Sequence, residues 1–196
     1  MPDLDESPRE HKSLTSLFVD PKEATKEAKR LYRLGGARAV QDAGFIVGWR
    51  GWLFSALGEA PTDMVLHSIC VGGVWPIDGP LCKNKEIGIH IVKSPMSAIT
   101  SPGSTIFCQV PGIVAGWGSS GFFRRGWTVE YATPIALGQP DDNVSFFQGE
   151  CLILVTDYHQ VGLANAIDRT TLTAKSYNVP VLSNEQLSQE MTDLGS

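Results

Sequence analysis

Cys151, in the sequence Gly149-Glu150-Cys151, is the residue whose setting comes nearest to that of a catalytic nucleophile. A thiolate nucleophile needs a histidine base and hydrogen-bond donors for the oxyanion. His67 or His90 could supply the base, but neither stands in a recognisable pattern with this cysteine. Leu152 follows where a second glycine would usually shape the oxyanion hole, and the surrounding apolar run would raise the pKa of the thiol. We expect no enzyme activity and keep a cytoplasmic β-barrel cysteine protease as an alternative.

Two other sequence patterns have the residue spacing of a ligand-binding site but not the secondary structure that such a site needs. His67 and Cys70 are three residues apart, and on a strand such positions face opposite sides, so they cannot easily share one metal ion. Residues 116–121 match the glycine spacing GxGxxG of a dinucleotide-binding loop. That loop needs a helix directly after it, whereas the aromatic and β-branched residues of FFRRGWTVEYATP follow here. We expect neither a metal nor a cofactor.

A basic and aromatic cluster surrounds Arg124 and Arg125. Arginine and aromatic residues are enriched at protein interfaces, and the same mixture can stack on nucleic acid and neutralise it. Plain turn residues are a third interpretation. We favour a subunit interface that also uses two earlier tryptophans. The predicted interface residues are Trp49, Trp52, Phe122, Phe123, Arg124, Arg125 and Trp127.

One helix is predicted ahead of the β-rich region. Asp20 can cap it, Pro21 suits its first position and Glu23 has the capping-box spacing. Two glycines, at 35 and 36, predict its end at Leu34. Its cations lie toward the C-terminal end, where the helix dipole favours them. They form either a solvated face, which we favour, or a candidate RNA-facing patch: Lys26, Lys29, Arg30 and Arg33.

From residue 44 onward, short runs of β-branched and aromatic residues alternate with turn-forming clusters. Pro111-Gly112 predicts a bend, a bulge or a sheet edge within one of these runs. Six to eight strands argue for a sandwich or barrel, so we predict an all-β fold, an eight-stranded antiparallel jelly-roll β-sandwich with one N-terminal helix. The expected strands cover residues 45–57, 64–74, 86–92, 106–117, 127–137 and 144–156.

The composition fits one domain with few charges. The chain has 196 residues and a net charge of −5, and residues 41–196 carry eight Lys and Arg against fourteen Asp and Glu, a net charge of −6. This balance argues against a dedicated nucleic-acid-binding domain. Four separated cysteines and no apolar leader predict reduced thiols in the cytoplasm, and no run reaches the ~18 apolar residues of a membrane span. We expect an arm and helix at 1–40, a jelly-roll domain at 41–182 and a polar tail at 183–196.

The order of helix then sheet, the early run AGFIVGWRGWLFSAL and the late run GECLILVTDY resemble capsid proteins of picorna-like viruses. In that group an early strand often carries a tryptophan followed by a basic residue and a glycine, as Trp49-Arg50-Gly51 does here. The chain is most similar in layout to a small capsid protein of the plant secovirus group. The resemblance covers roughly residues 40–170.

The resemblance implies a structural protein that is released from a polyprotein and needs no cofactor. Such proteins assemble with related jelly-roll subunits into an icosahedral shell around an RNA genome, which they contact weakly or indirectly. The implied locations are the virion and the host cytoplasm, with no membrane partner. A β-sandwich ligand-binding module is a further alternative to this interpretation.

Overall fold

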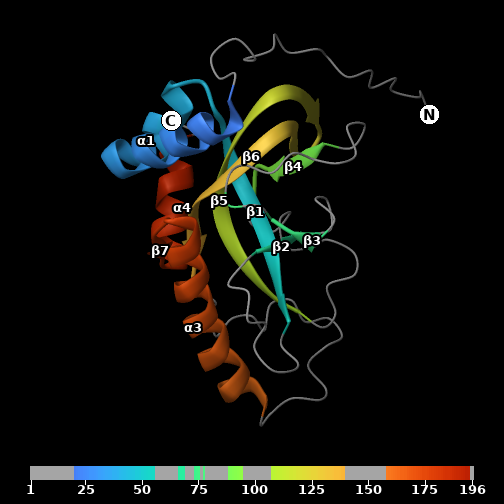
Figure 1. The fold of residues 1–196 in the computed structure, drawn as a ribbon, viewed down its shortest axis with the longest axis vertical. Helices are drawn as coiled ribbons and strands as arrows, with labels where there is room; N and C mark the ends of the chain where they lie inside the picture. The colour runs from blue at the N-terminus through green and yellow to red at the C-terminus, as the bar shows by residue number, and fades with distance from the viewer. Residues whose placement is uncertain are drawn as a thin grey trace, which may run out of the picture.

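The structure is a computed structural model, and it describes residues 20–55, 66–68, 73–75, 77, 88–94, 107–139 and 158–194. Within these ranges a strongly curved sheet is flanked by helices on one side (Figure 1). The helices are α1 (Pro21–Asp42), α3 (Tyr158–Tyr177) and α4 (Asn184–Thr192). The strands are β1 (Ile46–Ser55), β2 (His67–Ser68), β3 (Gly73–Val74), β4 (Ile89–Val92), β5 (Phe107–Phe123), β6 (Gly126–Gly138) and β7 (Val181–Leu182).

Helix α1 begins as predicted and is interrupted at the two glycines where its end was predicted. The Asp20 carboxylate caps it by accepting from the backbone N–H of Lys22 at 2.9 Å, and proline occupies the first turn. At Gly35 and Gly36 the backbone leaves the helical region, with φ of −157° and +64°, and the helix then resumes to Asp42. The first helical segment therefore ends at Leu34 as predicted, and a second segment that was not predicted continues to Asp42 after the kink.

The sheet contains a closed circuit of four strands. β1 pairs antiparallel with β5 from Ile46↔Gly116 to Ser55↔Phe107, and β5 pairs with β6 as a long hairpin. β6 in turn pairs with β4, and β4 returns to β1 at Trp49↔Val92. The short strands β2 and β3 extend the sheet beyond β1, and β7 joins β6 in parallel. Closing four strands on themselves leaves each with a hydrogen-bonded neighbour on both sides.

The long hairpin strands can curve this tightly because their register shifts and their glycines allow it. The β5–β6 register shifts between Ile113 and Val114, and the residue skipped there is Ile135 of β6. Pro111 and Gly112 keep a regular register with β1, so the irregularity lies beside this pair and not within it. A Cβ on Gly126 would lie 2.0 Å from the Ile91 carbonyl oxygen. Only a residue without a side chain lets β6 approach the β4 backbone so closely.

Two hydrophobic cores cover the two faces of the curved sheet. The inner core lies within the circuit of strands and reaches the end of α3. The outer core joins the other face of β1, β5 and β6 to α1 and α4. The inner core contains Trp52, Leu66, Trp75, Ile89, Ile91, Val114, Val129, Ala132, Leu137, Ala174 and Tyr177. The outer core contains Ala24, Ala28, Tyr32, Ala37, Val40, Phe45, Val47, Trp49, Val92, Ile113, Ala115, Trp117, Ile135, Ala136 and Leu187.

The expectation of an all-β fold holds only in part. The sheet is confirmed, and Ile89 and Ile91 share its buried inner face as the alternation predicted. However, helices of 22, 20 and 9 residues accompany it, and α3 lies in residues 158–177, for which no helix was predicted. The described strands form one seven-stranded sheet and not the two packed sheets of an eight-stranded jelly roll. The strand expected at 144–156 lies outside the described residues.

The predicted tail begins with a well-formed cap. Ser183 accepts from the backbone N–H of Gln186, and the Gln186 side chain accepts from the Ser183 N–H, which is a complete capping box. The side chain of Leu187 is fully buried in the outer core. Residues 183–194 are therefore packed against the rest of the fold.

Candidate functional site

The β5–β6 hairpin ends in a two-residue turn made by Arg124 and Arg125. Phe123 pairs with Gly126 across this turn, and the backbone N–H of Lys93 donates to the Arg125 carbonyl oxygen at 3.0 Å. Neither arginine has a positive φ, so the turn does not need the Asn-Gly type of sequence that many tight hairpins require. We call Lys93, Phe122, Phe123, Arg124, Arg125 and Trp127 the hairpin tip.

The aromatic rings at the hairpin tip form a cross-strand pair under a cation. The rings of Phe122 and Trp127 meet edge-to-face across β5 and β6, with centroids 6.3 Å apart and an interplanar angle of 73°. The Lys93 ammonium nitrogen lies 4.4 Å from the Phe122 centroid and 5.3 Å from that of Trp127. Both distances fit a cation–π contact. Phe122 nevertheless stays 45% exposed, so part of its ring is available to a partner.

The opposite side of the tip is closed against the body of the protein. The Phe123 ring meets the His90 imidazole edge-on, with centroids 5.3 Å apart, and also packs against the outer core. Phe123 is accordingly half-buried. Its packing fixes the angle at which the tip leaves the sheet, so the Phe122 side is presented by a rigid element.

The hairpin tip concentrates positive charge. The side chains of Lys93, Arg124 and Arg125 are all exposed. Among the described residues, no ion pair joins any of these three to a carboxylate. Three cations beside exposed aromatic surface can bind an anionic partner and bury a ring at the same time.

The structure separates the predicted interface residues into two groups. Phe122, Arg124 and Arg125 are exposed at the tip, where Phe123 and Trp127 are half-buried. The side chains of Trp49 and Trp52, by contrast, are 4% and 0% exposed. β1 is covered on both faces, by the helices and by the inner core, so placing these two tryptophans at a subunit interface was wrong.

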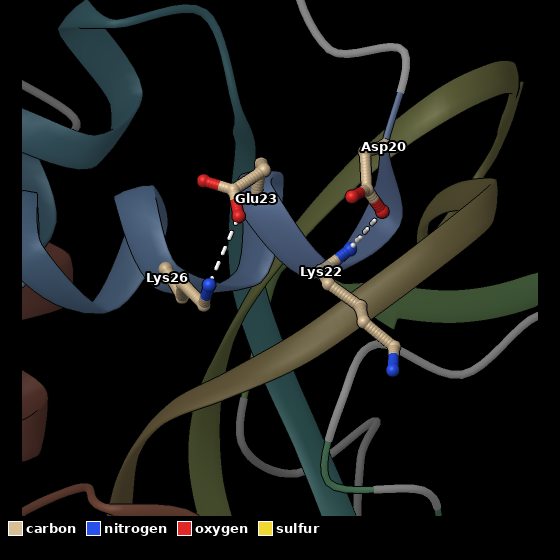
Figure 2. A network of polar contacts seen from close by, with 4 residues as sticks. All are labelled: Asp20, Lys22, Glu23 and Lys26. Atoms are coloured by element: carbon tan, nitrogen blue, oxygen red, sulfur yellow. Dashed lines mark hydrogen bonds and ion pairs between the residues drawn. The ribbon is translucent and has the colours of Figure 1, made fainter.

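The basic residues of α1 are mostly engaged within the chain. Lys26 pairs with Glu23 at 2.9 Å near the capped start of the helix (Figure 2). Arg30 pairs with Glu27 at 2.6 Å, and its guanidinium holds the pKa of that carboxyl below its usual range. Lys29 is buried and donates to the Tyr177 carbonyl oxygen at 2.6 Å.

These contacts bear on the candidate RNA-facing patch of α1. Lys29 cannot face RNA, because its ammonium group lies between α1 and the end of α3. Lys26 and Arg30 lie beside carboxylates that would repel a phosphate backbone. Arg33 is exposed on the same helix. A continuous basic face is therefore not formed on α1.

Arg50 of the Trp49-Arg50-Gly51 sequence lies in the interior. Its guanidinium stacks 4.6 Å from the Trp75 ring centroid and donates to the His90 carbonyl oxygen at 2.5 Å. Only 7% of the residue is exposed. The arginine thus links β1 to β4 and to the segment after β3, and its contribution in this fold is structural.

The candidate catalytic cysteine, Cys151, lies outside the described residues, as does the side chain of His67. His90, the other candidate base, has its ring against Phe123 at the hairpin tip. Within the described residues, no group of three or more His, Cys, Asp or Glu side chains could hold a metal ion. In the same part of the chain, no helix has the length and apolar character needed to cross a membrane.

Lys93 is the tip residue that sequence reasoning missed. It follows the alternating run 86–92 by one residue and is about 30 residues away from the arginines in the chain. Only the pairing of β4 with β6, Val92 opposite Gly126, brings it to the turn. The signal that could have found it is the glycine at 126, which allows a neighbouring strand to approach.

In comparisons with protein-family models, with curated proteins and with solved structures, nothing matches this chain.

Proposed function

We propose that this chain is a structural protein, a capsid subunit that assembles with related subunits into an icosahedral shell enclosing an RNA genome. It acts without a cofactor and is not an enzyme, and its locations are the virion and the host cytoplasm. The viral part of the proposal rests on the resemblance of residues 40–170 to capsid proteins of the plant secovirus group. The assembly part rests on the hairpin tip.

The observation that carries the proposal is the exposed Phe122 ring among three exposed cations. A rigid hairpin that holds an aromatic ring in solvent gains free energy when a partner covers the ring, at roughly 25 cal/mol for each Å² of apolar surface buried. Arginine and aromatic residues at the centre of such a contact typically dominate its energy. Subunit association is the function that uses these features together.

The most specific part of the proposal is that the capsid subunit is an eight-stranded jelly roll. It would need strands from ranges outside the described residues, such as the expected strand at 144–156. Assembly through the hairpin tip does not depend on that point, because the tip is built by β4, β5 and β6 alone.

The test is the mass and shape of the natively isolated protein, measured by sedimentation velocity and negative-stain electron microscopy. We expect closed particles of uniform size, or defined oligomers that lead to them. A single species of 21.2 kDa at every concentration tested would contradict the proposal.

A further inference from the structure

The hydroxyl group of Tyr177 lies within the pairing of β2 with β3. The register of the two strands places Leu66 opposite Trp75, as the pair next to His67↔Val74. A hydrogen-bonded antiparallel pair exchanges two N–H···O bonds. Here the Trp75 N–H donates to the Leu66 carbonyl oxygen at 2.7 Å. In place of the second bond, the Tyr177 hydroxyl accepts from the Leu66 N–H at 3.2 Å and donates to the Trp75 carbonyl oxygen. We call residues 66–68 and 73–75 the β2–β3 pair, and the two bonds of the hydroxyl the Tyr177 bridge.

The backbone of the β2–β3 pair is weakly joined to the rest of the sheet. β3 is the end of the strand order, and each of the two strands has two residues (Figure 1). Two isolated strands are marginally stable in water. Within the described ranges β2 meets β1 at one position, Leu53↔His67, whereas β1 pairs with β5 along its whole length. Side-chain contacts and the Tyr177 bridge therefore hold the β2–β3 pair in place.

The side chains of the β2–β3 pair favour this closed position only in part. Leu66 and Trp75 are fully buried in the inner core, and the Trp75 ring meets Trp52 edge-on with centroids 5.8 Å apart. However, the indole N–H groups of Trp52 and Trp75 are buried with no hydrogen-bond partner among the described residues. A buried donor without a partner loses the hydration that it has in water. Opening would restore this hydration and so offset part of the cost of exposing the rings.

Tyr177 is itself held by α1. The Lys29 ammonium group donates to the Tyr177 carbonyl oxygen at 2.6 Å and lies 6.0 Å from the centroid of its ring. Tyr177 is the last residue of α3 and is fully buried. The tyrosine therefore joins α1 to the β2–β3 pair, through its main chain on one side and its hydroxyl on the other.

We propose that the β2–β3 pair opens as a unit separate from the rest of the sheet, and that the Tyr177 bridge, positioned by Lys29, keeps it closed. Opening uncovers Trp52 and the inner core while the circuit of β1, β5, β6 and β4 stays paired. The bridge thus controls access to the apolar interior of the circuit. The inference is independent of the proposed function, since it concerns a conformational change within one chain.

Amide hydrogen exchange followed by NMR tests whether the β2–β3 pair opens separately. The probes are the N–H groups of Leu66 and Trp75, and the references are the amides paired between β1 and β5. After correction for intrinsic rates, we expect the probes of the natural chain to exchange about tenfold or more faster than the slowest references. Their exchange should also depend less on urea, because local opening exposes less surface than global unfolding. Equal rates with equal urea dependence would mean that the pair and the sheet open together, and the inference would be overturned.

The Tyr177 bridge is tested by Tyr177→Phe, which keeps the ring and removes the hydroxyl. Tyr32→Phe, at a buried tyrosine of the outer core, is the matched control. We expect exchange at Leu66 and Trp75 to accelerate by about tenfold or more in Tyr177→Phe only, because a buried N–H and a buried carbonyl lose their partner. The references should change much less. The inference fails if probes and references accelerate equally, or if Leu66 and Trp75 pair directly and their exchange stays unchanged.

Lys29→Met tests the positioning role of Lys29, and Lys26→Met, which loses only an exposed ion pair, is its control. If Lys29 acts through Tyr177, its replacement accelerates exchange at Trp75 in the natural chain and adds little in the Tyr177→Phe background, because contacts in one network are not additive. Equal effects in the two backgrounds, or equal acceleration of the references, would contradict the role given to Lys29.

Discussion

Replacing Gly126 by alanine tests the closed circuit of strands most directly. The new Cβ would lie 2.0 Å from the Ile91 carbonyl oxygen and 2.8 Å from the Val92 Cα, both of them backbone atoms of β4. No side-chain rotation can relieve these contacts, so β4 must move away from β6. Overpacking of this kind typically costs about 1–3 kcal/mol, and the upper end applies here because a strand has to move.

The matching control is Gly121→Ala on the other strand of the same hairpin. Its Cβ would meet one atom, the Thr128 hydroxyl oxygen at 2.8 Å, which belongs to a side chain and not to the backbone. We expect the loss of stability to be less than about 1 kcal/mol at this position, since side chains yield more readily than backbone. The pair therefore separates strand closure from the general effect of adding a methyl group.

Thermal unfolding followed by circular dichroism measures the difference. For a chain of 150–250 residues, 1 kcal/mol shifts the melting temperature by about 2–4 °C, so a cost of about 3 kcal/mol predicts a decrease of about 6–12 °C for Gly126→Ala. Measurements at two protein concentrations separate this effect from any change in association. Equal melting temperatures for the two variants would refute the role given to Gly126.

Three further predictions concern the contacts that join the helices to the fold. Glu190→Ala removes the carboxylate that accepts from the Ala37 N–H at 2.7 Å. The free energy of unfolding should fall by about 0.5–2 kcal/mol, as it does when other helix caps are lost. Gln189→Ala, on the exposed side of the same helix, serves as the control. Lys29→Met keeps the buried aliphatic part of the side chain and loses the hydrogen bond to the Tyr177 carbonyl oxygen. Urea unfolding should show that the free energy of unfolding falls by about 1–3 kcal/mol. The control, Lys26→Met, loses only an exposed ion pair and should cost a few tenths of a kcal/mol. Burial, and then the charge of Glu190, raise the pKa of Tyr32 above its ordinary value, so the unfolded chain loses this proton first and stability should fall as pH rises above about 10. The slope should be shallower in Tyr32→Phe, and equal slopes in both chains would contradict the assignment.

Local signals in the sequence predicted the parts of the fold that local chemistry determines. Asp20 and Pro21 start α1 as expected. The inward face of Ile89 and Ile91 also follows from alternation. Each of these depends on atoms a few residues apart.

Features that depend on distant partners were not predictable in this way. α1 continues beyond Gly36 because Glu190, more than 150 residues later, supplies the carboxylate that restarts it. α3 was missed because threonines fill two of the four positions of α3 whose side chains are described as buried, 170, 173, 174 and 177, and this conceals the helical period. Threonine in such a stripe looks like loop or strand when only the sequence is known.

The candidate site shows the same division. The sequence indicated Arg124, Arg125 and their aromatic neighbours, and the structure places these together at one turn. The sequence alone could not exclude Trp49 and Trp52 from the predicted interface. An aromatic residue on a strand shows the same sequence pattern whether its face packs against a partner or against the chain's own helix. Lys93 needed the strand pairing itself.

The bond from Lys29 to the Tyr177 carbonyl oxygen spans 148 residues, which has a consequence for synthesis on the ribosome. The β5–β6 hairpin is local and can form as soon as it emerges, because hairpins close in about 1–10 μs. Helix α1, made before these elements, cannot complete its packing until α3 and Leu187 of α4 have left the exit tunnel. A nascent chain therefore exposes the outer core until Leu187 has emerged, and chains that stop before α3 are expected to be substrates for chaperones and proteases.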